Sequence, residues 1–313
     1  MRLVVAIGGN ALIRAEDDGS WEQQLDNATG LAEELLALRA AGHELVLTHG
    51  NGPQVGLLLL QQDLGQAEVP PLPLDVLTAM TQGQIGYLLA TAIARVDPSV
   101  PTAALLTRVV VDPDDPALRA PTKPVGPFYD EAHARRLAGE RGWEVAADAG
   151  RGWRRVVGSP YPQDVLGADH VRAMLERGTV VIAAGGGGIP VARGADGLEG
   201  VQGVVDKDRC SAELALAVEA DLLVLLTGVP RVALDFGTRW ERELARITVA
   251  DAVRGLADGE FPAGSMGPKL EAAGRFVASG RGRAVITAVG HLAGTVDGTD
   301  GTWVVPDDAA VRA

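Results

Sequence analysis

Short apolar runs that end at glycine alternate along this chain with longer segments of helical periodicity. Residues 3–7 are all apolar and stop at Gly8 and Gly9, the pattern of a strand buried on both faces of a parallel sheet. A helix is predicted to begin after Ser20 and to end near Ala41, because apolar residues recur there on one face: Leu25, Ala28, Leu31, Leu35 and Leu38.

The same alternation continues through the rest of the chain. Further strands are predicted from residue 44 into a glycine loop at 50–52, and over 102–111, 180–184, 222–226, 284–287 and 302–305. Helices are predicted over 53–63, 74–96, 165–177, 208–220 and 268–278, with Asp208 as one N-terminal cap and Thr248 as the cap of another helix. Strands separated by helices predict a mostly parallel sheet with helices on both faces.

Residues 112–162 differ in composition from the rest of the chain. They are rich in proline, glycine and charge, and they contain Lys123, Trp143 and Trp153. Loops of this length are usually functional or disordered, and the aromatic residues favour an ordered unit. We predict a small excursion from the main sheet with short hairpins of its own; an ordinary surface insertion is the alternative.

The chain is acidic, with 28 Lys and Arg against 41 Asp and Glu, a net charge of −13. This charge argues against a nucleic-acid or anionic-membrane surface. No apolar run approaches the roughly 18–20 residues that span a bilayer, and Gly8 interrupts the apolar start too early for a signal peptide. The single Cys210 excludes an internal disulfide and fits a reducing cytoplasm.

Lysine is rare in this chain, and its few positions are informative. Only three of the 28 basic residues are lysines, Lys123, Lys207 and Lys269, and all lie beside Pro, Gly or Asp in predicted loops. A compact ammonium on a flexible stem is not interchangeable with a guanidinium. We predict that the three lysines converge on phosphate groups; chance survival is the alternative.

Three predicted strands end in glycine loops: Gly8-Gly9-Asn10, Gly50-Asn51-Gly52 and residues 185–188. Ligands of open α/β sheets bind beyond the carboxyl ends of the strands. Glycine there lets backbone N–H groups approach phosphate oxygens closely. Three such loops together indicate a phosphorylated ligand, although any one of them could be only a tight turn.

Other common site signatures are missing from the sequence. The chain has no Gly-Lys dipeptide, hence no Walker A loop, and its five histidines are scattered, which disfavours a metal cluster. We interpret His49 as a packed side chain, with ligand contact as the alternative. Phosphoryl transfer needs mainly positioning and positive charge. Asp206 and Asp208 can orient Lys207 by ion pairing, and one of them can support Mg²⁺ through water.

Long stretches of the sequence carry a family resemblance. They include Val-Ala-Ile-Gly-Gly-Asn-Ala at 5–11, Thr-His-Gly-Asn-Gly-Pro-Gln-Val-Gly at 48–56 and Gly-Ser-Met-Gly-Pro-Lys at 264–269. The others are residues 80–83, 110–113, 121–128, 148–154, 185–191 and 206–208. In type and order these stretches resemble carbamate kinases, of the amino acid kinase family, and the match covers nearly the whole chain.

The resemblance implies a fold and a reaction. The fold is a three-layer α/β/α sandwich with a mostly parallel central sheet, a single domain over 1–313 with a small protruding subdomain inserted at about 113–162, usually homodimeric. The reaction is reversible phosphoryl transfer between ATP and carbamate, with ADP and carbamoyl phosphate on the other side. Mg²⁺ is the cofactor, held mainly by the nucleotide phosphates. The implied setting is arginine deiminase-type catabolism in the cytoplasm, without nucleic acid or membrane partners.

The resemblance also implies roles for individual residues. Lys207 and Lys269 would contact the transferring phosphoryl group and the nucleotide phosphates, Asp208 would orient them, and Lys123 would reach over the acyl phosphate. The carbamoyl phosphate end would be held by Gly8, Gly9, Asn10, Gly50, Asn51 and Gly52. The nucleotide would lie near Gly185, Gly186, Asp206, Thr227, Gly228 and Met266.

The sequence departs from the family pattern at a few positions. Pro230 stands where an acidic residue is common, which could alter nucleotide contacts, and Pro262-Ala263 has the reverse order of the usual pair. Related kinases of this fold carry a lysine at the position of Ala6; carbamate kinases do not, and Lys123 can supply the missing charge. Two rival functions remain: an acetylglutamate-type acyl-phosphate kinase, and a non-catalytic nucleotide-sensing protein.

Overall fold

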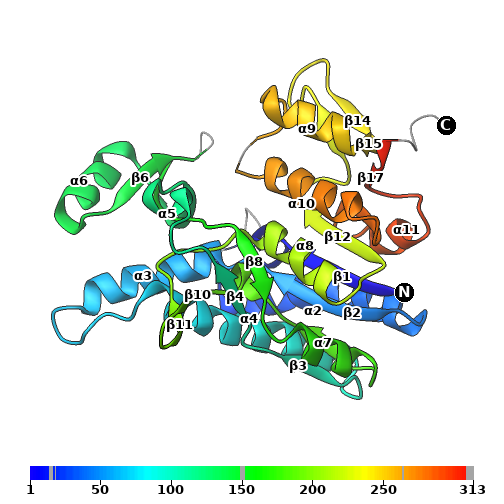
Figure 1. Cartoon of the computed structure of the whole chain (residues 1–313), viewed down its shortest axis with the longest axis horizontal. Helices are drawn as coiled ribbons and strands as arrows, with labels where there is room; N and C mark the ends of the chain where they lie inside the picture. Colours follow the sequence, from blue (N-terminus) through cyan, green and yellow to red (C-terminus); the bar gives the residue numbers. More distant parts are fainter. Residues whose placement is uncertain (14–16, 18, 149–151, 263, 308–313) are drawn as a thin grey trace.

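An eight-stranded sheet runs through the computed structural model, which describes residues 1–13, 17, 19–148, 152–262 and 264–307 (Figure 1). The strand order is β15-β17-β16-β12-β1-β2-β9-β3. Their bounds are Arg246–Thr248, Thr302–Val305, Arg283–Ala288, Leu222–Thr227, Arg2–Ile7, Glu44–His49, Val180–Ile182 and Thr102–Ala104. All paired neighbours are parallel except β16 and β17. The mostly parallel sheet expected from the sequence is confirmed.

Two layers of helices cover the sheet and complete the three-layer sandwich. Alternate residues of β1 face opposite cores, Leu3 and Val5 on one side and Val4 and Ala6 on the other, as the side-chain period of a strand requires. One layer contains α1 (Gly9–Leu12), α2 (Trp21–Ala40), α4 (Leu74–Val96) and α11 (Leu292–Val296). The other contains α7 (Ala168–Leu175), α8 (Lys207–Ala217), α9 (Val249–Ala257) and α10 (Met266–Ala278).

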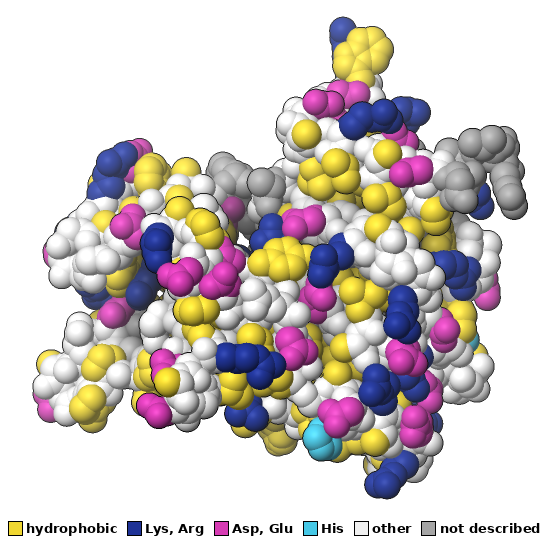
Figure 2. Space-filling view, in the orientation of Figure 1, with side chains coloured by type: hydrophobic (Ala, Val, Ile, Leu, Met, Phe, Trp, Pro, Cys, Tyr) yellow, Lys and Arg dark blue, Asp and Glu magenta, His cyan; other side chains and the backbone are white. Residues whose placement is uncertain are grey.

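Residues within the predicted excursion form a sheet of their own. Its three strands, in the order β5-β7-β6, are Lys123–Tyr129, Trp153–Val157 and Glu144–Ala147, accompanied by α6 (Glu131–Arg141). This unit stands to one side of the molecule in Figures 1 and 2. It packs on α3 (Gly52–Gly65) at Gly56, where an added Cβ would lie 1.9 Å from the Cα of Gly126.

Two smaller sheets and two short helices complete the fold. The four-stranded sheet has the order β11-β10-β4-β8, and the remaining pair is β13 with β14. Their bounds are Gly197–Gly200, Ile189–Gly194, Arg108–Val111 and Pro162–Val165, then Val232–Leu234 and Arg242–Leu244. The short helices are α5 (Pro116–Arg119) and the 3₁₀ turn η1 (Gly185–Gly187).

Several local predictions need correction. The strand expected over 102–111 is two strands in different sheets, β3 and β4. Residues 105–107 between them belong to neither strand, and the backbone N–H of Thr107 donates to the Gln82 side chain. The helix expected from residue 165 begins at Ala168, since Val165 still pairs in β8. The caps predicted at Ser20 and Thr248 are confirmed, but α8 is capped by Asp206, not by Asp208.

The surface carries charges of both signs. On the face in Figure 2, basic and acidic side chains of the described residues lie interspersed. Within the described part of the chain, each helix is too short or too polar to cross a lipid bilayer.

Candidate active site

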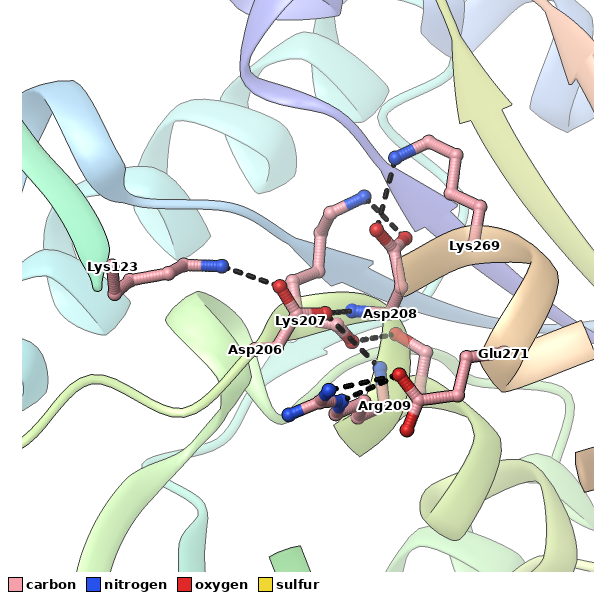
Figure 3. Close-up of polar contacts among 8 residues, drawn as sticks. Lys123, Asp206, Lys207, Asp208, Arg209, Lys269 and Glu271 are labelled. Carbon is pink, nitrogen blue, oxygen red and sulfur yellow. Dashed lines mark hydrogen bonds and ion pairs between the residues drawn. The ribbon is translucent and has the colours of Figure 1, made fainter. Parts of the chain in front are cut away.

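The three lysines converge on two neighbouring carboxylates at the start of α8 (Figure 3). Lys207 Nζ lies 2.8 Å from Asp208 Oδ1, and Lys269 Nζ lies 2.9 Å from Asp208 Oδ2. Lys123, from β5, donates to Asp206 Oδ2. The cluster therefore joins three distant segments of the chain, the small sheet, α8 and α10.

The local geometry of Asp206 explains how these groups are held. Asp206 Oδ1 accepts hydrogen bonds from the backbone N–H groups of Asp208 at 2.9 Å and Arg209 at 3.3 Å. Such a cap satisfies donors that the first turn of a helix leaves free. Because Oδ1 caps the helix, Oδ2 is directed to Lys123, and Lys207 and Asp208 are fixed in the first helical turn.

Two glycine loops border the lysine cluster. A Cβ on Gly50 would lie 3.7 Å from the backbone nitrogen of Gly9 and 3.8 Å from Cδ of Lys207. A Cβ on Gly8 would lie 3.2 Å from the carbonyl oxygen of Leu226. The carboxyl ends of β1 and β2 meet here because these strands are parallel neighbours. Asn10 belongs to α1, and its side chain lies outside what the structure describes.

Asn51 and Gly52 begin α3 beside these loops. The amide nitrogen of Asn51 donates to Thr81 Oγ1 at 2.9 Å, and the residue is only 3% exposed. Its side chain is therefore used within the protein. A Cβ on Gly52 would lie 3.9 Å from the carbonyl oxygen of Pro124, next to Lys123. Gly52 thus lies where the small sheet meets the main body.

Gly185 and Gly186 lie on the side of the site opposite Thr227. They are buried against side chains of the β2 loop: a Cβ on Gly185 would lie 2.1 Å from His49 Nε2, and one on Gly186 would lie 2.3 Å from Asn51 Nδ2. They follow β9, which β2 and β1 separate from β12. The structure therefore does not bring these glycines beside Thr227.

Thr227 and Gly228 lie at the carboxyl end of β12, the neighbour of β1 on its other side. Thr227 is the last residue of β12, and Met266 is the first residue of α10, one helical turn before Lys269. A Cβ on Gly228 would meet no atom within 4 Å, so the backbone there is open to approach. Ala263, in the loop before α10, lies outside the described residues.

Burial and charge shape the protonation of the cluster. Burial, opposed by the Asp208 carboxylate, lowers the pKa of Lys207 to about 8. Burial alone would raise the pKa of Asp208, but Lys207 and Lys269 outweigh it and lower that pKa. Lys123 and Lys207 likewise lower the pKa of Asp206 against the effect of burial. Three ammonium groups face two carboxylates, which favours an anionic ligand.

Two other reactive side chains take no part in this arrangement. His49 is 1% exposed, its Nδ1 lies 3.0 Å from the carbonyl oxygen of Gly50, and burial lowers its pKa to about 4. It is the neutral, packed histidine preferred from the sequence. Cys210 is fully buried in α8, and burial raises the pKa of its thiol, so it does not supply a nucleophile.

Gln82, for which the sequence predicted no role, supports the glycine loop after β9. Its amide nitrogen donates to the carbonyl oxygens of Gly185 at 2.8 Å and Thr107 at 3.2 Å. Its amide oxygen accepts from the backbone nitrogen of Thr107 at 2.8 Å. The sequence signal that could have identified Gln82 was its place in the 80–83 stretch that carries the resemblance.

A buried pair of hydroxyls joins β2 to α8. The Thr48 and Ser211 hydroxyl oxygens lie 2.6 Å apart.

The family model described as "Amino acid kinase family" matches residues 1–288. The chain belongs to this family. Within the family it is similar to carbamate kinases over nearly its whole length. It is 45% identical to the carbamate kinase of Pyrococcus furiosus, over 97% of this chain and 99% of the relative. It is 46% identical to the carbamate kinase of Halobacterium salinarum, over 97% of this chain and 98% of the relative.

Solved structures of this family agree with the fold. A carbamate kinase from Giardia lamblia bound to AMP-PNP superposes with a TM-score of 0.86 and 36% identity, over 98% of each chain. The same enzyme bound to citric acid superposes with a TM-score of 0.91 over 98% of each chain. These likenesses confirm the amino acid kinase fold expected from the sequence.

Proposed function

We propose that this protein is a carbamate kinase, which transfers a phosphoryl group reversibly between carbamoyl phosphate and ADP to give ATP and carbamate. The observation that carries the proposal is the convergence of three ammonium groups on two aspartates beside the glycine loops of β1 and β2. The full-length similarity to carbamate kinases selects this reaction among those of the family.

The chemistry demands positive charge and positioning more than proton transfer. A carbamate oxygen is already anionic, so it needs no general base, which suits a site whose buried His49 is neutral. Lys207 and Lys269 neutralise charge on the transferring phosphoryl group, while backbone N–H groups of the β1 and β2 loops bind its oxygens. Asp208 holds the two ammonium groups, and Lys123 covers the acyl end.

The remaining site residues divide between the two substrates. Gly8, Gly9, Asn10, Gly50, Asn51 and Gly52 serve the carbamoyl phosphate end. Thr227, Gly228 and Met266 serve the nucleotide, because the backbone at Gly228 is open at the end of β12 and Met266 begins the helix that carries Lys269. Gly185 and Gly186 pack closely against His49 and Asn51, so their part in nucleotide binding is indirect.

Magnesium fits this site as an ion that arrives with the nucleotide. Among the described residues, no group of three or more His, Cys, Asp or Glu side chains is arranged to hold a metal. Mg²⁺ commonly keeps several waters and binds through one or two carboxylates and substrate phosphates. Asp206 or Asp208 would hold it through water, and it would neutralise charge on the phosphates.

An ATP-formation assay with ADP and carbamoyl phosphate tests the proposal. We expect turnover with carbamoyl phosphate and none with N-acetylglutamyl phosphate. Turnover only with the second substrate would favour an acetylglutamate-type kinase, and nucleotide binding without turnover would favour a nucleotide-sensing protein. Either result would contradict the proposal.

The pH dependence of this reaction follows from Lys207. The protonated ammonium is the form that stabilises the phosphoryl group, and burial lowers its pKa to about 8. We expect kcat/KM, which reports the free enzyme, to fall as the pH rises through about 8. The alkaline fall in the pH profile of kcat should lie at higher pH, because a bound phosphate stabilises the protonated ammonium of Lys207. A flat kcat/KM profile up to pH 10 would contradict this role.

Lys123 is expected to act mainly on carbamoyl phosphate. Its side chain is 28% exposed, more open than those of Lys207 and Lys269, and it comes from the small sheet. In Lys123→Ala we expect KM for carbamoyl phosphate to rise by about tenfold or more, the cost of about one charge-assisted hydrogen bond. KM for ADP serves as the internal control. Unchanged steady-state constants for carbamoyl phosphate would rule this role out.

We also propose a homodimer in the cytoplasm, with residues 113–162 as a protruding subdomain of a single domain. Val76, Met80 and Tyr87 form an exposed stripe on α4, and Trp21 stacks on Tyr87 with ring centroids 5.7 Å apart. Such stripes commonly mark protein contacts. Light scattering should give a dimer, and Tyr87→Asp should weaken it; a monomeric wild-type protein would contradict this assignment.

The physiological setting that we propose for the reaction is arginine deiminase-type catabolism.

A further inference from the structure

Two ion pairs outside the lysine cluster join α8 to α10. Arg209 donates to Glu271 Oε2 through Nη2 at 2.8 Å and through Nε at 3.1 Å. One helical turn further along both helices, Arg275 donates to Glu213. Because the second pair lies four residues on in each helix, α8 and α10 run side by side in the same direction at this contact.

The Tyr161 ring lies beside both pairs. The guanidinium carbons of Arg209 and Arg275 lie 5.3 Å and 5.5 Å from its centroid. Tyr161 belongs to the segment that returns from the small sheet, and its backbone nitrogen donates to Asp115 Oδ2 at 2.7 Å. The ion pairs thus also contact the connection to the unit that carries Lys123.

The Arg209–Glu271 pair lies next to the proposed phosphoryl site. Arg209 directly follows Asp208, and Glu271 lies two residues after Lys269. In Figure 3 this pair and the contact of Lys207 and Lys269 with Asp208 lie on opposite sides of the first turn of α8. The start of α10 therefore makes two ion pairs with α8, one from Lys269 to Asp208 and one from Glu271 to Arg209.

The position of Arg209 is electrostatically unfavourable in isolation. A cation in the first turn of a helix opposes the helix dipole, and Arg209 is the third residue of α8. Its half-buried contact with Glu271 offsets that cost. An arginine at this position is thus explained by a contact between helices and not by the stability of α8 alone.

A second contact between the helices matters because Lys269 has to serve two partners at once. When a phosphoryl group binds, we expect the ammonium of Lys269, which has three donors, to turn at least one of them to it while Asp208 stays its counter-charge. Arg209 and Glu271 involve none of the three lysines. They can hold α10 in place while Lys269 shifts its hydrogen bonds.

We propose that Arg209 and Glu271 form a positioning pair, which keeps Lys269 at its distance from Lys207 and Asp208 during phosphoryl transfer. This inference rests on the proposed carbamate kinase activity. The pair does not touch substrate; it acts through the helix that carries Lys269.

The neighbouring pair offers a matched control, because Glu213 and Arg275 join the same two helices one turn away. We expect Glu271→Gln to lower kcat by about tenfold, since small misplacements of reacting groups cost one to two orders of magnitude. Both KM values should stay within about twofold of wild type, the pattern of an interaction that acts in the transition state. Glu213→Gln should keep kcat within about twofold of wild type, although we expect the thermal midpoint to fall in both variants, since each loses one ion pair.

The charge-swapped double variant Arg209→Glu with Glu271→Arg should recover most of the lost kcat. A kcat unchanged in Glu271→Gln, or lowered equally in Glu213→Gln, would overturn the inference. A crystal structure of Glu271→Gln tests it without turnover: Lys269 Nζ should move away from Asp208. Wild-type protein that forms no ATP would refute the proposed activity alone, and an unmoved Lys269 would refute the positioning pair alone.

Discussion

Lys207→Arg is expected to lower kcat for ATP formation by about 10²–10³-fold, or about 3–4 kcal/mol of transition-state stabilisation. The side chain of Lys207 is 12% exposed, and a Cβ added to Gly50 would lie 3.8 Å from its Cδ. A guanidinium keeps the charge but is wider and planar, and it cannot place one compact donor between Asp208 and the glycine loops.

The same loss is expected in Lys269→Arg, because Lys269 is 10% exposed and shares Asp208. Steady-state kinetics with both substrates and calorimetric ADP binding form the measurement. ADP affinity close to wild type, together with an unchanged thermal midpoint, would show that the loss is in the chemical step. Near-normal kcat in both variants would refute the phosphate role of these lysines.

Asp208→Asn is expected to reduce both stability and activity. The variant leaves two nearly buried ammonium groups without the carboxylate that each contacts. Removing one partner of a buried ion pair costs about 3–5 kcal/mol in the free energy of unfolding. Without the carboxylate, the pKa of Lys207 should fall further, so that less of it is charged at neutral pH and kcat falls by about 10²-fold.

Asp251→Asn provides the control for Asp208→Asn. Asp251 pairs with Arg254 on the exposed surface of α9, where such pairs contribute about 0–1 kcal/mol. Chemical denaturation of the two variants should therefore differ by at least about 2 kcal/mol. Equal stabilities, or an alkaline limb of kcat/KM at the wild-type position, would contradict the role of Asp208 as the shared counter-charge.

The sequence predicted the parts of the site that depend on short-range patterns. Apolar runs ending in glycine located β1 and β2, and parallel pairing brings their ends together. The scarcity of lysine singled out Lys123, Lys207 and Lys269 although they lie up to 146 residues apart (269 − 123). Their convergence in the structure agrees with that prediction, whereas their individual catalytic roles stay predictions.

Features that depend on distant partners escaped the sequence. Asp206 and Asp208 are equally good caps by residue type. Only the folded structure shows that Asp206 caps α8 and pairs with Lys123, whereas Asp208 pairs with Lys207 and Lys269. Gln82 lies within a long helix, so its bonds to Thr107 and Gly185 depend on packing of α4 against the sheet. Gly185 follows a strand like the other loops, but strand order places it away from Thr227.

A crystal structure with ADP, magnesium and aluminium fluoride tests the central claim most directly. The aluminium fluoride group mimics the phosphoryl group during its transfer. We expect it to lie within about 3 Å of the ammonium groups of Lys207 and Lys269 and to accept hydrogen bonds from backbone N–H groups of the β1 and β2 loops. A fluoride group bound elsewhere, with both lysines turned away from it, would contradict the account.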